Sequence, residues 1–168
     1  MSGFWKCVLY AAALALLAHP LGQAIPGPFD PEKRLFRSRK WEQNGRIYTK
    51  LAIDKWKKLV PDMSRILPDM VKKQVTPTAV TAAQAAVLVQ ETCVAEAVHT
   101  ASSLLGLVCL GMWPGWGGVL VWLVWFLLGN LPFILIQRYN RPRLIRLRAL
   151  LQRREQRKGS HEHPDTDL

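Results

Sequence analysis

Residues 118–137 form a run of 20 consecutive positions without a charged side chain. Wound as an α-helix, a run of this length crosses a hydrocarbon core of about 30 Å. An α-helix also satisfies its own backbone hydrogen bonds, which lipid cannot do. The run therefore predicts a membrane-spanning helix.

Two further apolar blocks, residues 4–22 and 94–113, predict two more spans. The uncharged turn Trp113-Pro-Gly-Trp-Gly-Gly118 joins the second and third spans into a helical hairpin. The first block also fits a cleaved signal peptide, with Gly22-Gln23-Ala24 as the cleavage site. The start of the block carries only Lys6 and a dense basic run follows the block, and this charge order favours a retained helix with its N-terminus outside.

The chain carries 23 Lys and Arg against 12 Asp and Glu, a net charge of +11. Thirteen of these basic residues lie within 32–73 and nine within 138–158, on either side of the hairpin. Basic loops stay cytoplasmic, so both segments and the C-terminus are expected on the cytoplasmic side of the membrane. Because the basic runs border apolar spans, their expected partner is anionic phospholipid and not nucleic acid.

Six residues of the basic loop recur at helical spacing, with basic residues between them: Tyr48, Leu51, Ala52, Lys55, Trp56 and Leu59. This pattern predicts an amphipathic helix in the headgroup plane, ended by Pro61. The expected fold is an all-α membrane protein: three transmembrane helices, this interfacial helix and a basic cytoplasmic tail. Residues 1–152 form its single domain, and 153–168 are expected to be a polar, disordered tail.

Ionisable side chains cluster at the cytoplasmic edge of the middle span. At about 100° per residue, Thr92, Glu96 and His99 fall on one helix face, with Glu91 about 80° from His99. Such groups at membrane depth usually face a polar cavity or a partner, and Glu96 beside His99 would make the imidazole a general base.

A structural interpretation of these carboxylates stays open, in which Glu91 and Glu96 pair with arginines across the hairpin. A metal site is less favoured, since no second His lies at a helical repeat from His99, and no metal is expected. Cys7, Cys93 and Cys109 form no metal-binding pattern and are expected to be buried thiols.

A second cluster follows the last span. Arg138, Arg141 and Arg143 surround Tyr139 and Asn140, and guanidinium groups suit phosphate or carboxylate binding. The alternative is a basic membrane anchor, but the polar residues between the arginines favour a site. Asn130, inside the span, is expected to face another helix or a polar cavity.

Four motifs, in this order over about residues 29–144, resemble the glycosyl-4,4'-diaponeurosporenoate acyltransferase family of bacterial carotenoid synthesis. They are Arg39-x-Trp41-Glu42-x-x-Gly45-x-x-Tyr48, Lys55-Trp56-Lys57-x-x-x-Pro61-Asp62, Glu91-Thr92-x-x-x-Glu96-x-x-His99, and Asn130-x-Pro132 through Gln137-Arg-Tyr-Asn-Arg-Pro-Arg143. The resemblance implies an acyltransferase that moves a fatty acyl group to a sugar hydroxyl of a membrane glycolipid or glycosylated carotenoid. The donor would be acyl-CoA or an acyl carrier protein, and no cofactor is expected.

Direct transfer from the thioester is the expected mechanism, since the chain lacks a Gly-x-Ser-x-Gly nucleophile elbow and the His-x-x-x-x-Asp box of the glycerolipid acyltransferases. His99 would act as general base with Glu96 as its orienter and Glu91 nearby, and Asn130 would donate to the oxyanion. The expected substrate-binding residues are Trp56, Thr92, Arg138, Tyr139, Asn140, Arg141 and Arg143. The competing hypothesis is a non-catalytic membrane subunit whose Glu, His and Arg clusters pair helices.

The charge pattern predicts that both basic segments face the cytoplasm. In a cysteine-free background, single cysteines near Lys58 and near Arg154 should react with a membrane-impermeant maleimide from the same side. A cysteine near Gly115 should react from the opposite side. Opposite labelling of the two basic segments would contradict the hairpin.

Overall fold

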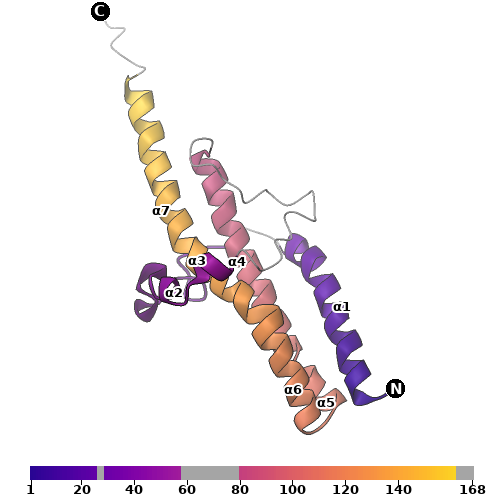
Figure 1. Ribbon diagram of the computed structural model, residues 1–168. Helices are drawn as coiled ribbons and strands as arrows, with labels where there is room; N and C mark the ends of the chain where they lie inside the picture. Colours follow the sequence, from indigo (N-terminus) through magenta and orange to yellow (C-terminus); the bar gives the residue numbers. More distant parts are fainter. Residues whose placement is uncertain (26–28, 58–79, 162–168) are drawn as a thin grey trace, which may run out of the picture.

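The structure is a computed structural model that describes residues 1–25, 29–57 and 80–161. Every regular element in these ranges is a helix (Figure 1). In chain order they are α1 (Gly3–Ala24), the 3-10 helix η1 (Lys40–Gly45), α2 (Ile47–Lys50), α3 (Ile53–Trp56), α4 (Ala82–Leu105), α5 (Val108–Met112), α6 (Trp116–Val124), the π-helix η3 (Trp125–Asn130) and α7 (Leu131–His161).

Three stretches are long and apolar enough to cross a membrane: Gly3–Ala24, Ala82–Met112 and Trp116–Lys158. The predicted all-α fold with three spans is thereby confirmed. The middle helix starts before the predicted position 94, because Thr81 and Gln84 form a capping box that begins α4 at Ala82. Exposed apolar side chains such as Leu16 and Leu128 give these helices the surface that lipid requires.

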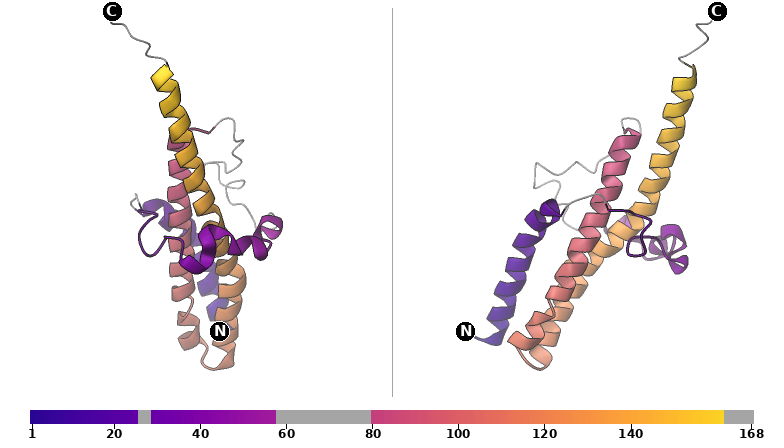
Figure 2. Two further views of the ribbon diagram at one scale, coloured as in Figure 1. Left: turned by 90° about the vertical axis from the view of Figure 1, so that its left-hand side faces the viewer. Right: turned by 180° about the vertical axis from the view of Figure 1, so that it is seen from behind.

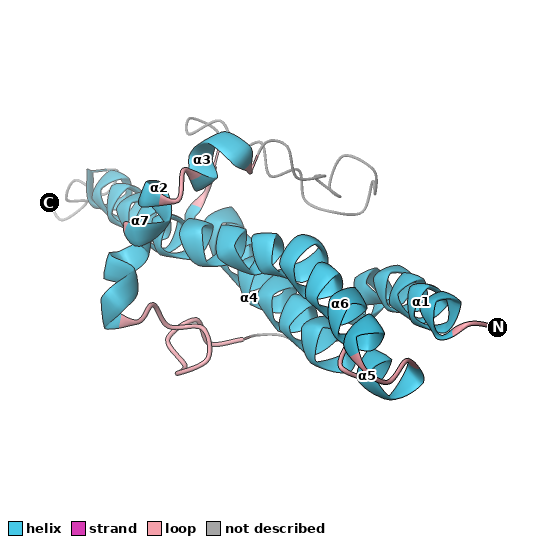
Figure 3. Ribbon diagram, turned by 60° about the horizontal axis from the view of Figure 1, so that its bottom comes forward, coloured by secondary structure: helices cyan, strands magenta, loops and turns pink. Residues whose placement is uncertain are grey.

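The hairpin organises the molecule. α4 packs along α7, and α1 packs against α4 and α6 beside them (Figure 2). The N-terminus and the α5–α6 turn lie at one end, and the C-terminal part of α7 lies at the other. Seen obliquely from the turn, α1, α4 and α6 stand next to one another (Figure 3).

The helix of the middle span is broken between Leu105 and Val108, near the turn of the hairpin. A helix end leaves carbonyl groups without intrahelical partners. The indole N–H groups of Trp122 and Trp125 donate to the Ser103 and Ser102 carbonyls, at 3.0 and 3.2 Å. The tryptophans of the third span therefore donate hydrogen bonds to the carbonyl groups beside the break in the second span.

Two sequence-based expectations about local structure need correction. The predicted amphipathic helix is interrupted, because Ala52 adopts a left-handed conformation with φ 51° and separates two four-residue helices, α2 and α3. Their Tyr48 and Ile53 are buried against Tyr139 of α7, so these turns dock on the protein. The proposed stop at Pro61 lies outside the described residues.

The expected disordered tail is helical as far as His161. The Glu155 carboxylate accepts a hydrogen bond of 3.0 Å from the Ala82 N–H and so satisfies a free donor at the start of α4. Leu151 is buried against Ala82 and Ala85. These contacts extend α7 beyond the predicted boundary at 152, and residues 162–168 lie outside the described part of the chain.

The first helix packs on the hairpin through small and polarisable groups. The Cys7 thiol donates to the Cys109 carbonyl at 3.6 Å, and all three cysteines are buried and free, as predicted. Retention of this helix in the mature protein stays a prediction.

The turn between α5 and α6 requires a glycine at 118. A Cβ there would lie 2.5 Å from the Cys109 carbonyl oxygen and nearer still to that of Trp113, and backbone cannot retreat as a side chain can. Gly118→Ala should therefore cost about 1–3 kcal/mol, the usual cost of overpacking, seen as a lower thermal midpoint in detergent. Gly111→Ala is the matched control, because nothing lies within 4 Å of its Cβ position. Equal midpoints for the two variants would contradict this account of the turn.

Candidate active site

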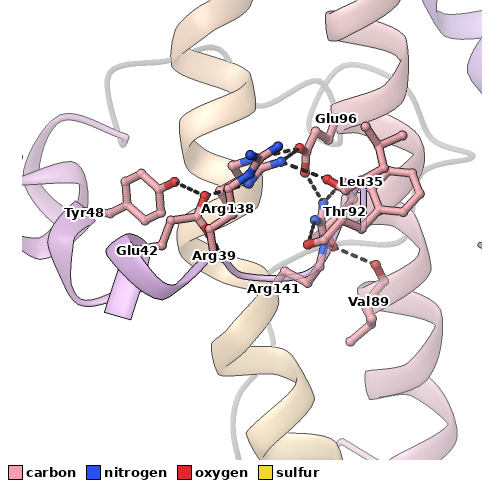
Figure 4. Close-up of polar contacts among 10 residues, drawn as sticks. Leu35, Arg39, Glu42, Tyr48, Val89, Thr92, Glu96, Arg138 and Arg141 are labelled. Atoms are coloured by element: carbon pink, nitrogen blue, oxygen red, sulfur yellow. Dashed lines mark hydrogen bonds and ion pairs between the residues drawn. The ribbon is translucent and has the colours of Figure 1, made fainter. Parts of the chain in front are cut away.

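A row of four alternating charges runs between η1, α7 and α4 (Figure 4). Arg138 pairs with Glu42 at 2.6 Å and with Glu96 at 2.7 Å, and Arg141 pairs with Glu96 at 2.6 Å. Glu42, Glu96 and Arg141 are each at most 3% exposed. Buried ions are tolerated only when they are paired and hydrogen-bonded, so these four residues act as one electrostatic unit.

Arg141 uses its whole guanidinium group. Its Nε donates to the Thr92 hydroxyl at 3.0 Å, and its two terminal nitrogens donate to the carbonyls of Thr92 and Phe36, both at 2.8 Å. Thr92 is positioned for this contact by its own hydrogen bond to the Val89 carbonyl. Arg138 similarly reaches the Leu35 carbonyl at 2.9 Å, so the two arginines tie residues 35 and 36 to the hairpin.

Glu42 is turned inward by a strained local backbone. The next two residues, Gln43 and Asn44, both have left-handed φ values, 49° and 53°. Burial raises the pKa of Glu42, but hydrogen bonds from the Arg39 N–H, the Arg138 guanidinium and the Tyr48 hydroxyl outweigh it. The net effect is a pKa below the ordinary 4.5, so Glu42 is an anion at neutral pH.

Tyr48 is the neutral member of this cluster. Burial and the hydrogen bond to Glu42 raise the pKa of its hydroxyl, which therefore stays protonated and donates at 2.9 Å. Glu42 is the residue that sequence reasoning missed as a site member. The feature of the sequence that could have identified Glu42 is its position as a carboxylate within a strongly basic segment.

The second polar pair lies further along the spans. His99 Nδ1 is 3.0 Å from the Asn130 Oδ1, and the Asn130 amide nitrogen donates to the Trp125 carbonyl at 3.0 Å. Asn130 ends the π-helix η3, and π-helical turns recur at functional sites. The imidazole stacks on Phe133, with ring centroids 4.5 Å apart and planes 6° from parallel. Asn130 and Phe133, which contact the imidazole of His99, thus both belong to the third span.

These contacts revise two predicted roles. Both carboxylate oxygens of Glu96 face arginines, and Asn130 is the group that hydrogen-bonds the imidazole. Its amide nitrogen is directed to the Trp125 carbonyl, which argues against the expected part as oxyanion donor. The ion pairs match the structural alternative for Glu96, whereas His99 and Asn130 remain together as a candidate catalytic pair.

The remaining predicted residues surround this core. Arg143 lies over the Tyr139 ring, 3.5 Å from its centroid, and donates to the Tyr139 carbonyl and the Thr49 hydroxyl. Trp56 packs beside this buried ring, with its indole N–H bonded to the Leu51 carbonyl. The expected phosphate-binding fork is therefore largely turned inward. Glu91 and Asn140 are both half-buried.

A polar groove of about 420 Å³ adjoins the charge row, between residues 31–44 and α7. Glu42, Arg138 and Arg141 all contribute to its lining, so the groove reaches the buried network. Within the described residues, no three His, Cys, Asp or Glu side chains are grouped to hold a metal ion.

Comparison with known proteins gives a consistent result. The sequence profile of glycosyl-4,4'-diaponeurosporenoate acyltransferases matches residues 32–150. Curated proteins of that name from Staphylococcus aureus are 28% identical, for example over 153 residues in strain bovine RF122 / ET3-1 and 155 residues in strain MRSA252. Each alignment covers 90% of this chain and 91% of the relative. No solved structure gives a significant match.

The geometry of Arg141 predicts that charge alone cannot replace it. Arg141→Ala leaves Glu96 partly uncompensated in a buried site and should destabilise the protein by about 3–5 kcal/mol. Arg141→Lys keeps the charge but cannot reach Thr92 and Phe36 at once, so it should recover only part of the loss. Thermal unfolding in detergent measures both. Arg154→Ala, an exposed position on the same helix, is the control for charge loss. A lysine variant as stable as the parent would contradict the network.

Proposed function

The chain belongs to the glycosyl-4,4'-diaponeurosporenoate acyltransferase family, and we propose that it transfers a fatty acyl group from an acyl thioester to a sugar hydroxyl of a membrane glycolipid or glycosylated carotenoid. The observation that carries the proposal is the His99–Asn130 pair, held within two helices long and apolar enough to cross a membrane. An imidazole at such a depth is costly to retain without a task.

Asn130 determines which imidazole nitrogen is basic. Its amide nitrogen faces the Trp125 carbonyl, which leaves its oxygen to accept from His99. Neutral His99 therefore carries its proton on Nδ1, and Nε2 is the nitrogen with a lone pair. Asn130 is accordingly a positioning residue, the role that the sequence predicts for Glu96.

The proposed step is direct acyl transfer. His99 Nε2 takes the proton of the sugar hydroxyl as its oxygen attacks the thioester carbonyl carbon. The tetrahedral intermediate collapses, the C–S bond breaks, and the thiolate leaves with the proton that His99 had taken. No covalent acyl-enzyme and no cofactor are needed, so atoms and charge balance within the two substrates and one base.

The ionic network supplies the frame for this step. Glu96, Arg138 and Arg141 join α4 to α7 on the cytoplasmic side of His99, and Glu42 joins η1 to the same row. Glu91, half-buried near this end of α4, is proposed as a second carboxylate at the mouth of the site. Thr92 acts through Arg141.

The substrates would approach from two phases. The acceptor, with an apolar tail, would lie in the bilayer with its sugar near Trp56, Tyr139 and Asn140. The donor, acyl-CoA or an acyl carrier protein, would come from the cytoplasm, where Arg138, Arg141 and Arg143 and anionic headgroups lie. This arrangement needs the orientation predicted from charge, with the N-terminus outside and the C-terminus inside the bacterial inner membrane.

One observation favours the competing hypothesis of a non-catalytic subunit, since the Glu and Arg side chains are closed against each other. The two hypotheses differ in what His99 does. A subunit needs His99 only for packing, whereas the enzyme needs it as a base that accepts the proton of the acceptor hydroxyl.

His99→Ala should lower acyl transfer by about 10²–10⁴-fold, the usual worth of general-base catalysis, while the protein still inserts and accumulates. Asn130→Ala should also lower the rate, and the double variant should cost far less than the product of the two, because the residues act as a unit. Transfer is measured with labelled acyl donor in membranes, per molecule of protein detected by immunoblot.

Thr100→Ala, the next position on α4, is the matched control and should transfer at close to the parent rate. A His99→Ala protein that accumulates normally and transfers at the parent rate would contradict the mechanism.

A further inference from the structure

The groove beside the charge row has a strongly basic lining drawn from two separate segments. Arg37 and Ser38 come from the loop after α1, and Arg146 comes from α7, two turns beyond Arg138. Four guanidinium groups line the groove, those of Arg37, Arg138, Arg141 and Arg146, against the carboxylates of Glu32 and Glu42. The excess of positive charge favours an anionic ligand.

The four arginines are not equivalent. Arg138 and Arg141 donate to protein carboxylates and carbonyls, so their charge is largely compensated. Arg37 and Arg146 are exposed, and neither side chain forms an ion pair or hydrogen bond within the part of the chain that the structure describes. Their donors are available to a ligand from opposite walls of one groove.

A third group in the lining also lacks a partner. The Ser38 hydroxyl oxygen is buried and has no hydrogen-bond partner among the described residues. Buried hydroxyls are nearly always hydrogen-bonded, because leaving one unsatisfied costs about 1–3 kcal/mol. A ligand oxygen in the groove would supply that partner.

We propose that this groove binds a phosphate ester through Arg37 and Arg146, with Ser38 as a neutral donor. A phosphate has several acceptor oxygens and at least one full negative charge, which suits two guanidinium groups and one hydroxyl. The ligand is either the phosphate of the donor's pantetheine arm or the headgroup of a phospholipid, and the first source rests on the proposed function.

The groove lies at a suitable separation from His99 for a donor. Along α7, Arg138 is 8 positions and Arg146 is 16 positions beyond Asn130, or roughly 12 and 24 Å at 1.5 Å per residue. In acyl-CoA and in acyl carrier proteins an extended pantetheine chain separates the phosphate from the thioester. A phosphate held in the groove therefore leaves the thioester free to reach toward the His99–Asn130 pair.

Binding of coenzyme A, without an acyl chain, to the purified full-length protein in neutral detergent tests the site by titration calorimetry. Arg37→Ala and Arg146→Ala should each weaken binding by about tenfold or more, since a hydrogen bond to a charged group is worth about 1.5–3 kcal/mol. Ser38→Ala should weaken it less. Arg154→Ala removes the same charge from an exposed site on α7 outside the groove and should leave affinity nearly unchanged.

A second arm identifies the source of the phosphate, using short-chain phosphatidylglycerol as the probe against phosphatidylcholine of equal chain length. Binding of phosphatidylglycerol that depends on Arg37 and Arg146, with no binding of coenzyme A, supports the site and assigns it to a headgroup. If neither probe depends on Arg37 and Arg146 more than on Arg154, the site is overturned.

The outcome is separable from that of the proposed function. His99→Ala should bind coenzyme A as tightly as the parent, because His99 lies outside the groove lining. Arginine-dependent binding in a protein that transfers no acyl group would retain the site and refute the function. Acyl transfer whose donor KM is unchanged in the double variant Arg37→Ala/Arg146→Ala, with binding of both coenzyme A and phosphatidylglycerol also unchanged, would retain the function and refute the site.

Discussion

The burial of Glu42, Arg138, Glu96 and Arg141 in one row is the constraint on which the other contacts depend. Removing an ion from water costs several kcal/mol even after relaxation, and only a complete set of partners offsets that cost. Here each arginine meets carboxylates and main-chain carbonyls together. The row therefore fixes three segments against one another: the loop and η1 at residues 35–42, α4 through Glu96, and α7 through both arginines. A sliding of α7 along α4 would leave at least one charge unpaired.

With the two long helices fixed in this way, the deeper parts of the hairpin can depart from regular geometry. The break after Leu105, the π-helix η3 and the indole contacts of Trp122 and Trp125 all occur on the side away from the charge row. The π-helical turn ends at Asn130, whose amide bonds both the Trp125 carbonyl and His99. An irregular backbone inside a membrane is tolerated where side chains satisfy the released polar groups. The same irregularity gives His99 a fixed ring orientation, which a general base requires.

Hydropathy and charge order predicted the three spans and the hairpin, because each depends on composition over many residues. Helical periodicity also placed Thr92, Glu96 and His99 on one face, and all three face α7 or η3. Helical periodicity does not identify the residue that lies across the helix–helix interface. Periodicity therefore predicts that Glu96 pairs with the nearby His99, although in the structure Glu96 pairs with the arginines of α7. Glu42, the left-handed Ala52 and the cap that Glu155 provides for α4 depend on contacts between distant segments, which no local pattern contains.

The proposed reaction would bring a water-soluble donor to an acceptor dissolved in lipid. The charges of the row itself nearly cancel, since Arg138 and Arg141 are balanced by Glu42 and Glu96. The row therefore contributes shape and rigidity to the groove and little net attraction. Under the proposal, attraction for an anion falls to Arg37 and Arg146, which are exposed. Binding of a phosphate would then depend on other arginines than the stability of the hairpin does, although all four line one groove. Both basic segments contribute arginines to this groove, and only the partners of each guanidinium group distinguish the structural arginines from those proposed to bind the ligand.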